Sequence, residues 1–476
     1  MNFFSLTLAG LFLLALQITV TVHIILHKED VPSAIGWTGL VWLTPILGSI
    51  VYIILGINRV RRKAMRLHNR GANIFTVSGK TSQEIEKALP PSWWQLLQLG
   101  YKTHPQHFSL GNSIRPLVNG DEAYPRMCQA ISAAQKEVLI ASYIFNNDAA
   151  GELFIPVLRQ AAQNGAKVRI LVDGVGLNYS RPTIQRALHG IKGIEFSVFL
   201  PNKTPVNLPF VNLRNHRKMM IIDGKTAFFG GMNISAGNLL QQKPKEPIQD
   251  ITFEIQGPVI DQISRVFEED WIFSGKKSFL PQSSHQKPPD PPAGPSAARL
   301  IPDGPDADYG KIERLCLGAL ACAQKSATIV TPYFLPENNI LSALETAALR
   351  GVKIEIILPQ KSNIFGMDWA MQANFGRLLK KGVKIYRTPP PFDHSKLFMI
   401  DETWVFFGSA NWDVRSFKLN FESNLECFDP HLAKQLHHLV EQKKKQAVCV
   451  DKEIYHPLSL WNTLRNNAFR LLTPYY

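Results

Sequence analysis

The sequence predicts an α/β protein with two related halves that contain mixed sheets, preceded by two transmembrane helices. Three observations lead to this prediction. The first is a strongly apolar N-terminal region, and the second is an internal repeat in the body of the chain. The third is the alternation of strand-like and helix-like segments within each repeat, which favours sheets covered by helices on both faces.

The size and composition of the chain narrow the class of protein. A chain of 476 residues is longer than a typical domain with a single hydrophobic core, so two domains or one duplicated domain are expected. Hydrophobic residues make up 45% of the chain, which excludes global disorder. The formal net charge of +14 suits an anionic partner, either nucleic acid or an anionic lipid surface. The five cysteines form no CxxC pair, so we predict no disulfide framework and a catalytic domain in a reducing compartment.

Two apolar stretches predict a transmembrane anchor over residues 1–58. Phe3 to Leu26 is almost wholly apolar, and Gly36 to Ile57 contains no charged residue. As helices rising about 1.5 Å per residue, both are long enough to cross a hydrocarbon core of about 30 Å. A cleaved signal peptide is the alternative for the first stretch, but it lacks a basic leading region and a clear cleavage site.

A basic juxtamembrane segment is assigned to residues 59–110. It begins with the cluster Arg59, Arg61, Arg62, Lys63, Arg66 and Arg70. Basic residues that flank a span mark its cytoplasmic end, and each adds about 1 kcal/mol of attraction to an anionic leaflet. Two crossings would place the N-terminus and the main body in the cytoplasm. Trp93 and Trp94 fit either interfacial anchors or core residues.

The body of the chain contains two segments that match in order and content. KEVLIASYIF at 136–145 matches KSATIVTPYF at 325–334, and each predicts a strand that enters a loop. Residues 154–173 then match residues 340–359. Each of these predicts an amphipathic helix, a glycine stop and a buried strand.

The repeat divides the body into two halves, residues 111–280 and residues 299–476. Between them lie residues 281–298, which are rich in proline and predict a semi-extended linker. A duplicated chain of this kind can bring its halves together about a pseudo-twofold axis. One site would then contain a motif from each half.

An HxKxxxxD motif closes each repeat. Its fixed residues are His216, Lys218 and Asp223 in the first copy and His394, Lys396 and Asp401 in the second. A single HxK would most often be a partly buried surface pair. Two copies at matching places in a repeat instead favour a catalytic site.

The spacing within the motif predicts different roles for its members. An apolar run, a turn and a second apolar run predict a strand, a turn and a strand. His216 and Lys218 are two residues apart, so both side chains leave the same face of the strand. Asp223 lies at an odd offset from His216, at the turn. We therefore expect Asp223 and Asp401 to hold the turn or orient a neighbour.

A two-residue turn would also fix the register of each hairpin. With Gly224 and Lys225 as the turn, position 216 pairs with Asn233 and position 394 pairs with Asn411. A bulge would shift this register. The same register places two small residues opposite the lysines, namely Gly231 and Ser409.

Two histidines, two lysines and two asparagines in one cleft would form an anion site. Phosphoryl transfer needs such charges and donors to stabilise the equatorial oxygens. A neutral histidine can attack phosphorus while a second one protonates the leaving alcohol. Asp250 and Glu422 are the candidate carboxylates that would fix the tautomers. Lysines beside the histidines would repel a divalent cation and no acidic cluster accompanies them, so we expect no metal and no other cofactor.

The motifs resemble those of the phospholipase D superfamily, and their flanks are similar to those of bacterial cardiolipin synthases. The flanks are NLRNHRK at 212–218, TPYFLP at 331–336 and GSANWDVRSFKLNFE at 408–422. The resemblance covers nearly the whole chain, including the apolar N-terminal stretches. It implies two phospholipase D-like α-β-α halves related by a pseudo-twofold axis.

The resemblance also implies a phosphatidyltransferase at a bacterial inner membrane, with a cytoplasmic catalytic domain. One histidine would attack the phosphate of phosphatidylglycerol, form a phosphatidyl-histidine and release glycerol. The other would protonate that glycerol and then deprotonate a hydroxyl of a second phosphatidylglycerol, giving cardiolipin. The sequence does not decide which histidine attacks, and the resemblance favours His216. The expected partners are phosphatidylglycerol and other anionic lipids of the membrane, with no nucleic acid.

Some features depart from the family or stay open. Ile248 and Gln249 precede Asp250 where the family usually has Trp-Arg, which fits an altered acceptor. The stretch from Leu458 to Leu472 has apolar residues at helical spacing and predicts either an interfacial helix or a packed one. Rival functions are a nuclease, a phospholipase D hydrolase, a transferase with another headgroup donor or acceptor, and a lipid-binding scaffold without activity.

Overall fold

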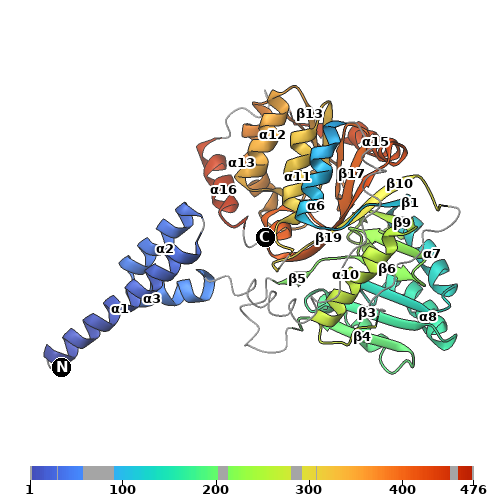
Figure 1. The fold of residues 1–476 in the computed structure, drawn as a ribbon, viewed down its shortest axis with the longest axis horizontal. Helices are drawn as coiled ribbons and strands as arrows, with labels where there is room; N and C mark the ends of the chain where they lie inside the picture. The colour runs from blue at the N-terminus through green and yellow to red at the C-terminus, as the bar shows by residue number, and fades with distance from the viewer. Residues whose placement is uncertain are drawn as a thin grey trace. The chain divides into compact units, whose positions relative to one another are not determined.

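The computed structural model describes residues 3–28, 30–56, 91–201, 213–279, 292–306, 308–450 and 459–473. The chain divides into two compact units (Figure 1). One contains residues 1–64 and 203–212, and the other contains residues 65–202 and 213–476. The predicted basic cluster at 59–70 and most of the predicted linker lie outside the described residues.

The N-terminal unit contains one long apolar helix, α1 (Phe3–His27). Within the described part of the chain, its Gly10–His27 portion is the one stretch that is long and apolar enough to cross a membrane. The next apolar stretch forms the shorter α2 (Val31–Leu43), α3 (Pro45–Val51) and the π-helical turn η1 (Tyr52–Gly56).

The second predicted transmembrane helix is not confirmed, because the chain bends at Thr44. This residue has φ −136° and ψ 78°, outside the helical region, and it directly precedes Pro45. Beyond the bend, Gly48 packs so closely on α2 that a Cβ would lie 2.4 Å from the Leu40 carbonyl oxygen. At about 1.5 Å per residue, neither α2 nor α3 alone reaches across about 30 Å of hydrocarbon.

The first half of the larger unit is a sheet with helices on both faces. Its strands are β1 (Ser109–Val118), β2 (Glu137–Ser142), β3 (Lys167–Asp173), β4 (Ile194–Phe199), β6 (Met219–Ile222), β7 (Thr226–Gly230) and β9 (Ile251–Gln256). Its main helices are α7 (Asn119–Ser132), α8 (Ala149–Gln163) and α10 (Val259–Phe273). Shorter helical turns are η3 (Gly176–Tyr179), α9 (Ile184–Ala187), η5 (Ala236–Asn238) and η6 (Leu240–Gln242).

The second half repeats this plan. Its strands are β10 (Ser296–Asp303), β11 (Ser326–Val330), β13 (Lys353–Pro359), β14 (Lys384–Thr388), β16 (Leu397–Ile400), β17 (Trp404–Gly408), β19 (Asn420–Phe428) and β20 (Val448–Cys449). Its helices are α11 (Lys311–Cys322), α12 (Asn338–Leu349), α13 (Met367–Leu379), α14 (Val414–Lys418), α15 (Pro430–Gln446) and α16 (Leu460–Arg470).

One mixed sheet runs through both halves, and its order is close to symmetric. From β1 outward the first half reads β1-β9-β7-β6-β2-β3-β4, and from β10 outward the second reads β10-β19-β17-β16-β11-β13-β14. The centre is the antiparallel pair of β1 and β10, with Ser109 opposite Ala298 and Asn112 opposite Ser296. The repeat in the sequence is therefore a repeat in strand order, as the pseudo-twofold prediction requires.

Each half has its own apolar core because the buried strands alternate with amphipathic helices. In α8, Asp148 caps the first turn by accepting from the Ala150 N–H at 3.0 Å. Gly165, with φ +97°, follows the helix and turns the chain into the buried strand β3. Phe154 and Leu158 of this helix are fully buried against the strands.

The residues before β1 fold onto the second half. The turn η2 (Pro91–Trp93) and helix α6 (Trp94–Thr103) place Trp93, Leu96 and Leu97 in the core that contains α11. Trp93 is 5% exposed, whereas Trp94 is 47% exposed. Of the two tryptophans, Trp93 is thus a core residue.

The register predicted for the motif hairpins is wrong by one residue. Ile222 pairs with Thr226 in the first hairpin, and Ile400 pairs with Trp404 in the second, so each turn contains three residues. Asp223 and Asp401 belong to these turns with φ values of 53° and 52°. Asn233 and Asn411 are therefore not the cross-strand partners of positions 216 and 394.

Candidate active site

Short strands that cross between the halves position the motif histidines. Strand β5 (Arg214–Asn215) pairs in parallel with the start of β19, and β15 (Phe392–Asp393) pairs in parallel with β8 (Ile248–Gln249). The backbone N–H of His216 donates to the Phe421 carbonyl at 2.9 Å, and that of His394 donates to the Gln249 carbonyl at 2.8 Å. Each histidine is thus held by backbone from the opposite half.

The carboxylates that orient the histidines also come from the opposite half. His216 Nδ1 lies 2.9 and 3.0 Å from the two oxygens of Glu422, and His394 Nδ1 lies 2.8 Å from Asp250 Oδ2. Both carboxylates are fully buried. Each accepts the Nδ1 proton of a neutral imidazole, which leaves Nε2 as the ring atom available for chemistry.

Burial lowers the pKa of both histidines to about 4. For His216 the Glu422 carboxylate opposes this effect and the Lys218 ammonium adds to it. For His394 the Lys396 ammonium adds to it and Asp250 opposes it. Both imidazoles are therefore neutral near pH 7, which is the state that a nucleophilic histidine needs.

The motif lysines are buried next to the histidines. Lys218 Nζ donates to the His216 carbonyl at 2.6 Å, and Lys396 Nζ donates to the His394 carbonyl at 2.5 Å. Burial lowers the pKa of Lys218 well below its usual value and that of Lys396 to about 8. A bound phosphate would compensate the desolvation of both lysines and favour their charged forms, so the pair would attract an anion into this site.

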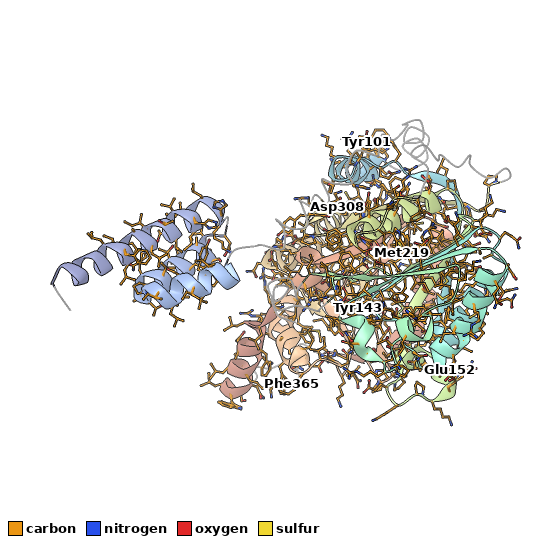
Figure 2. All side chains as sticks on the ribbon, turned by 90° about the horizontal axis from the view of Figure 1, so that it is seen from below. Tyr101, Tyr143, Glu152, Met219, Asp308 and Phe365 are labelled. Atoms are coloured by element: carbon orange, nitrogen blue, oxygen red, sulfur yellow. The ribbon has the colours of Figure 1, made fainter. Side chains whose placement is uncertain are left out.

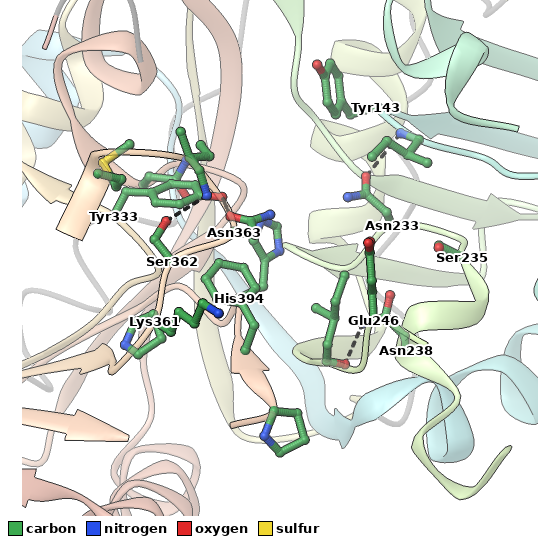
Figure 3. Close-up of a pocket in the computed structure, with 18 of the residues that line it drawn as sticks. Tyr143, Asn233, Ser235, Asn238, Glu246, Tyr333, Lys361, Ser362, Asn363 and His394 are labelled. Carbon is green, nitrogen blue, oxygen red and sulfur yellow. Dashed lines mark hydrogen bonds between the residues drawn. The ribbon is translucent and has the colours of Figure 1, made fainter. Parts of the chain in front are cut away.

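The histidines line one cavity of about 870 Å³ between the two halves (Figure 3). Asn233 and Asn411 also line it, one from each half. Asn233 Oδ1 accepts the Ile144 N–H at 3.1 Å, which fixes the orientation of its amide. The predicted histidines and asparagines therefore line one site. They are not cross-strand partners in the hairpins, as the predicted register would have made them.

Gly231 and Ser409 have positions other than those predicted. A Cβ on Gly231 would lie 3.1 Å from Lys396 Cδ and 3.2 Å from Asp250 Oδ1, so this glycine makes room for the lysine of the opposite half. Ser409 Oγ accepts the Ser423 N–H at 3.0 Å. Burial raises the pKa of Glu422, but contacts with His216 and Lys218 and a smaller contribution from Ser409 outweigh it, so the pKa is lowered.

The motif aspartates hold the hairpin turns and do not line the cavity. Asp223 accepts the backbone N–H groups of residues 135, 136 and 137 at 2.7 to 2.9 Å. Asp401 accepts those of residues 324, 325 and 326 at 2.7 to 2.8 Å. Burial raises the pKa of Asp223, but these three donors outweigh it and the pKa is lowered. Each aspartate therefore ties the turn to the start of the neighbouring strand.

Two tyrosines of the site were not among the predicted residues. The ring of Tyr143 lies 5.2 Å from the His216 ring in an edge contact, and Lys218 Nζ lies 5.5 Å from the Tyr143 ring centre. Tyr333 lines the opposite wall and donates its hydroxyl to Asn363 Oδ1 at 2.6 Å. They lie at neighbouring positions near the ends of the matched segments 136–145 and 325–334, and a tyrosine at the end of each strand-like segment is the signal that could have found them.

The fold and the site define a two-domain protein of the phospholipase D type. Residues 127–271 and 317–444 match the protein-family model described as "Cardiolipin synthase, PLD-like domain". Residues 15–56 match the one described as "Phospholipase_D-nuclease N-terminal". The chain belongs to the cardiolipin synthase family of phospholipase D-like proteins.

Individual proteins agree with this assignment. The chain is 29% identical over 485 residues to the major cardiolipin synthase ClsA of Bacillus subtilis, with 100% of both chains covered. It is 30% identical to a cardiolipin synthase of a Geobacillus species, with 98% of this chain and 94% of the relative covered. Among solved structures, the phosphatidylserine synthase of Haemophilus influenzae has the same fold, with a TM-score of 0.61 at 15% identity, and the match covers 80% of this chain and 98% of that one.

Proposed function

We propose that this phosphatidyltransferase joins two molecules of phosphatidylglycerol into cardiolipin and releases glycerol. The observation that carries the proposal is the pair of crossed contacts, His216 with Glu422 and His394 with Asp250, at one cavity. Two equivalent neutral histidines on one phosphate suit a two-step transfer, because one can attack while the other moves the proton. The family membership and the cardiolipin synthase relatives support the choice of lipid.

In the first step, His216 Nε2 attacks the phosphorus of one phosphatidylglycerol. The P–O bond to the headgroup glycerol breaks, and a P–N bond to His216 forms. His394, protonated at Nε2 when the anionic phosphate is bound, gives that proton to the departing glycerol oxygen. Lys218 and Lys396 stabilise the charge on the equatorial phosphate oxygens, together with the amides of Asn233 and Asn411.

In the second step, the terminal hydroxyl of another phosphatidylglycerol replaces glycerol. His394 accepts its proton, the oxygen attacks phosphorus, and the P–N bond breaks to restore His216. The carboxylates Glu422 and Asp250 keep both Nδ1 atoms protonated throughout, so each histidine works through Nε2. The aspartates Asp223 and Asp401 act indirectly, through the hairpin turns.

The experiment is a product analysis of the full chain reconstituted in phosphatidylglycerol vesicles. We expect equal amounts of cardiolipin and glycerol. Phosphatidic acid as the sole product would show hydrolysis, and cardiolipin formed only after addition of phosphatidylethanolamine would show a different donor. His216→Ala and His394→Ala should each abolish turnover while remaining folded, and a metal chelator should leave the rate unchanged.

We also propose a multi-pass anchor in a bacterial inner membrane, with the catalytic unit on the cytoplasmic side. The apolar stretches of residues 3–26 and 36–57 and the basic cluster that follows support this topology. In lipid, the stretch that bends at Thr44 would have to straighten to cross. Protease digestion of inverted membrane vesicles should remove the catalytic unit, whereas digestion of intact spheroplasts should spare it.

A further inference from the structure

The C-terminal helix α16 turns its apolar side away from the protein. Its exposed apolar residues, with those just after its end, are Leu460 (77% exposed), Trp461 (75%), Leu464 (55%), Leu471 (77%) and Leu472 (47%). They form one stripe at helical spacing. The fully buried residue of the helix is the polar Asn466, whose amide donates to Gln372 Oε1 of α13 at 3.5 Å. A helix that only packed on its domain would bury the apolar stripe.

The helix that carries the stripe also contacts the segment that leads into the catalytic cavity, through Phe469 on another side of the helix. Phe365 is 78% exposed, and its ring lies 5.7 Å from the Phe469 ring of α16 and 5.5 Å from the Trp369 ring. Residues 360–364, which directly precede Phe365, all line the cavity. Figure 2 shows Phe365 beside this helix at the edge of the unit, and Figure 3 shows Lys361, Ser362 and Asn363 at the cavity. Helix α16 is therefore packed beside a segment that lines the cavity.

The charges around the stripe select an anionic partner. Residues 459–473 contain Arg465 and Arg470 and no acidic residue. The Arg465 guanidinium lies 4.7 Å from the Trp369 ring, so it is held at the border between the helix and α13. Exposed leucine and tryptophan with arginine alongside are the composition of helices that lie in the interface of an anionic bilayer.

We propose that α16 and Phe365 form a docking surface for an anionic lipid bilayer, which holds the cavity at the level of the headgroups. The inference rests on the proposed lipid substrate, because a lipid must pass from the bilayer into the cavity. Docking beside residues 360–364 would shorten that path. It would also exclude water from the cavity, which favours transfer to a lipid hydroxyl over hydrolysis.

The test compares two presentations of one substrate to the full chain in phosphatidylcholine nanodiscs. Phosphatidylglycerol is supplied either within the nanodisc bilayer or as a short-chain, monomeric form in solution. For the Trp461→Ser, Leu464→Ser double variant we expect cardiolipin formation from the bilayer substrate to fall at least about tenfold, because two apolar side chains no longer enter the bilayer. Formation from the monomeric substrate should stay within about twofold of the wild type.

Leu349→Ser is the matched control, since Leu349 is 69% exposed but precedes β13, whereas the cavity residues 360–364 beside α16 follow that strand. It should leave both rates unchanged. An equal fall with both substrates in the double variant would indicate a structural role, and no fall with either would remove the docking role. A halved molecular mass of the double variant in detergent would identify a second copy of the chain as the partner and overturn the proposal.

A measurement that needs no turnover separates this proposal from the proposed reaction. Brominated acyl chains in a nanodisc that contains phosphatidylglycerol should quench the fluorescence contributed by Trp461, taken as the difference between the wild type and Trp461→Phe. Unquenched Trp461 contradicts docking even if cardiolipin is made. Quenched Trp461 in a protein that makes no cardiolipin supports docking and contradicts the reaction.

Discussion

At the scale of single residues, the site depends on keeping buried groups in chosen protonation states. His216 and His394 are neutral because burial disfavours the imidazolium, and a carboxylate on each Nδ1 fixes the tautomer. The lysines must instead stay charged to hold phosphate, although burial works against them. Because burial makes the lysines easier to deprotonate, we expect the activity to depend on pH.

Loss of the Lys396 ammonium should lower activity near pH 8. Its pKa of about 8 means that the free enzyme loses this ammonium as the pH rises through 8, so kcat/KM should fall there. The Lys396→Arg variant keeps the charge at all accessible pH values. It should be less active but should lose the part of the decline that is centred near pH 8. A decline that persists unchanged in the variant would assign it to another group.

The histidines should make the fold acid-sensitive. Their pKa is about 4 in the fold and near 6.5 in the unfolded chain, so the unfolded state binds more protons between these values. Their contribution to stability is complete above pH 6.5 and is lost as the pH falls toward 4. Urea unfolding of the wild type and of the His216→Gln, His394→Gln variant should show a weaker dependence on pH in the variant. Equal slopes over this range would contradict the neutral buried state.

Alanine variants of the two histidines should behave differently on a substrate whose leaving group departs without a proton. With a p-nitrophenyl phosphodiester lipid, His394→Ala should still release one equivalent of p-nitrophenol in a burst, because His216 can attack without an acid. His216→Ala should show no burst. The reverse pattern would make His394 the nucleophile.

At the scale of elements, the motif hairpins show how one residue can alter a register. The aspartate joins the turn because its carboxylate accepts three backbone N–H groups from the segment before the adjacent strand, and this positive-φ position lengthens the turn to three residues. The sequence motif gives the spacing of these residues. It does not show which distant backbone they bind.

Asp223→Ala should therefore act on stability more than on chemistry. It removes one ionised acceptor from three backbone donors, and we expect a loss of about 2 kcal/mol in the free energy of unfolding, limited by partial exposure to water. Chemical denaturation measures this loss. The kcat of the folded variant should fall far less than that of His216→Ala. Loss of all activity without loss of stability would mean that Asp223 takes part in the reaction.

At the scale of the whole molecule, the two halves share the site rather than each carrying one. His216 of the first half depends on Glu422 of the second, and His394 depends on Asp250 of the first. A double-mutant cycle on unfolding free energy with His216→Gln and Glu422→Gln should give a coupling of about 1 to 3 kcal/mol. The cycle of His216→Gln with Asp250→Asn should give a value near zero. Similar couplings in both cycles would contradict the crossed arrangement.

Much of this protein follows from the sequence because its signals are local or repeated. The matched segments, the two motifs and the alternation of helix and strand are read within short windows, and they predicted the two α/β halves. The second transmembrane helix stays a prediction, because an apolar stretch fixes composition but does not show a bend such as the one at Thr44. Tyr143 and Tyr333 were missed because a tyrosine at a strand end has no chemical signature until the fold turns it toward the cavity.

The sequence by itself determined that there are two HxKxxxxD motifs and that they belong to a duplication, and it made Asp250 and Glu422 the candidate carboxylates for the histidines. Only the tertiary structure decided which carboxylate serves which histidine. The reason is physical, since those pairs lie 206 and 144 positions apart and are brought together by the short parallel strands that cross between the halves. For the C-terminal helix, the sequence shows only that the apolar residues lie on one side. The packing of the helix on α13 decides that this side faces outward.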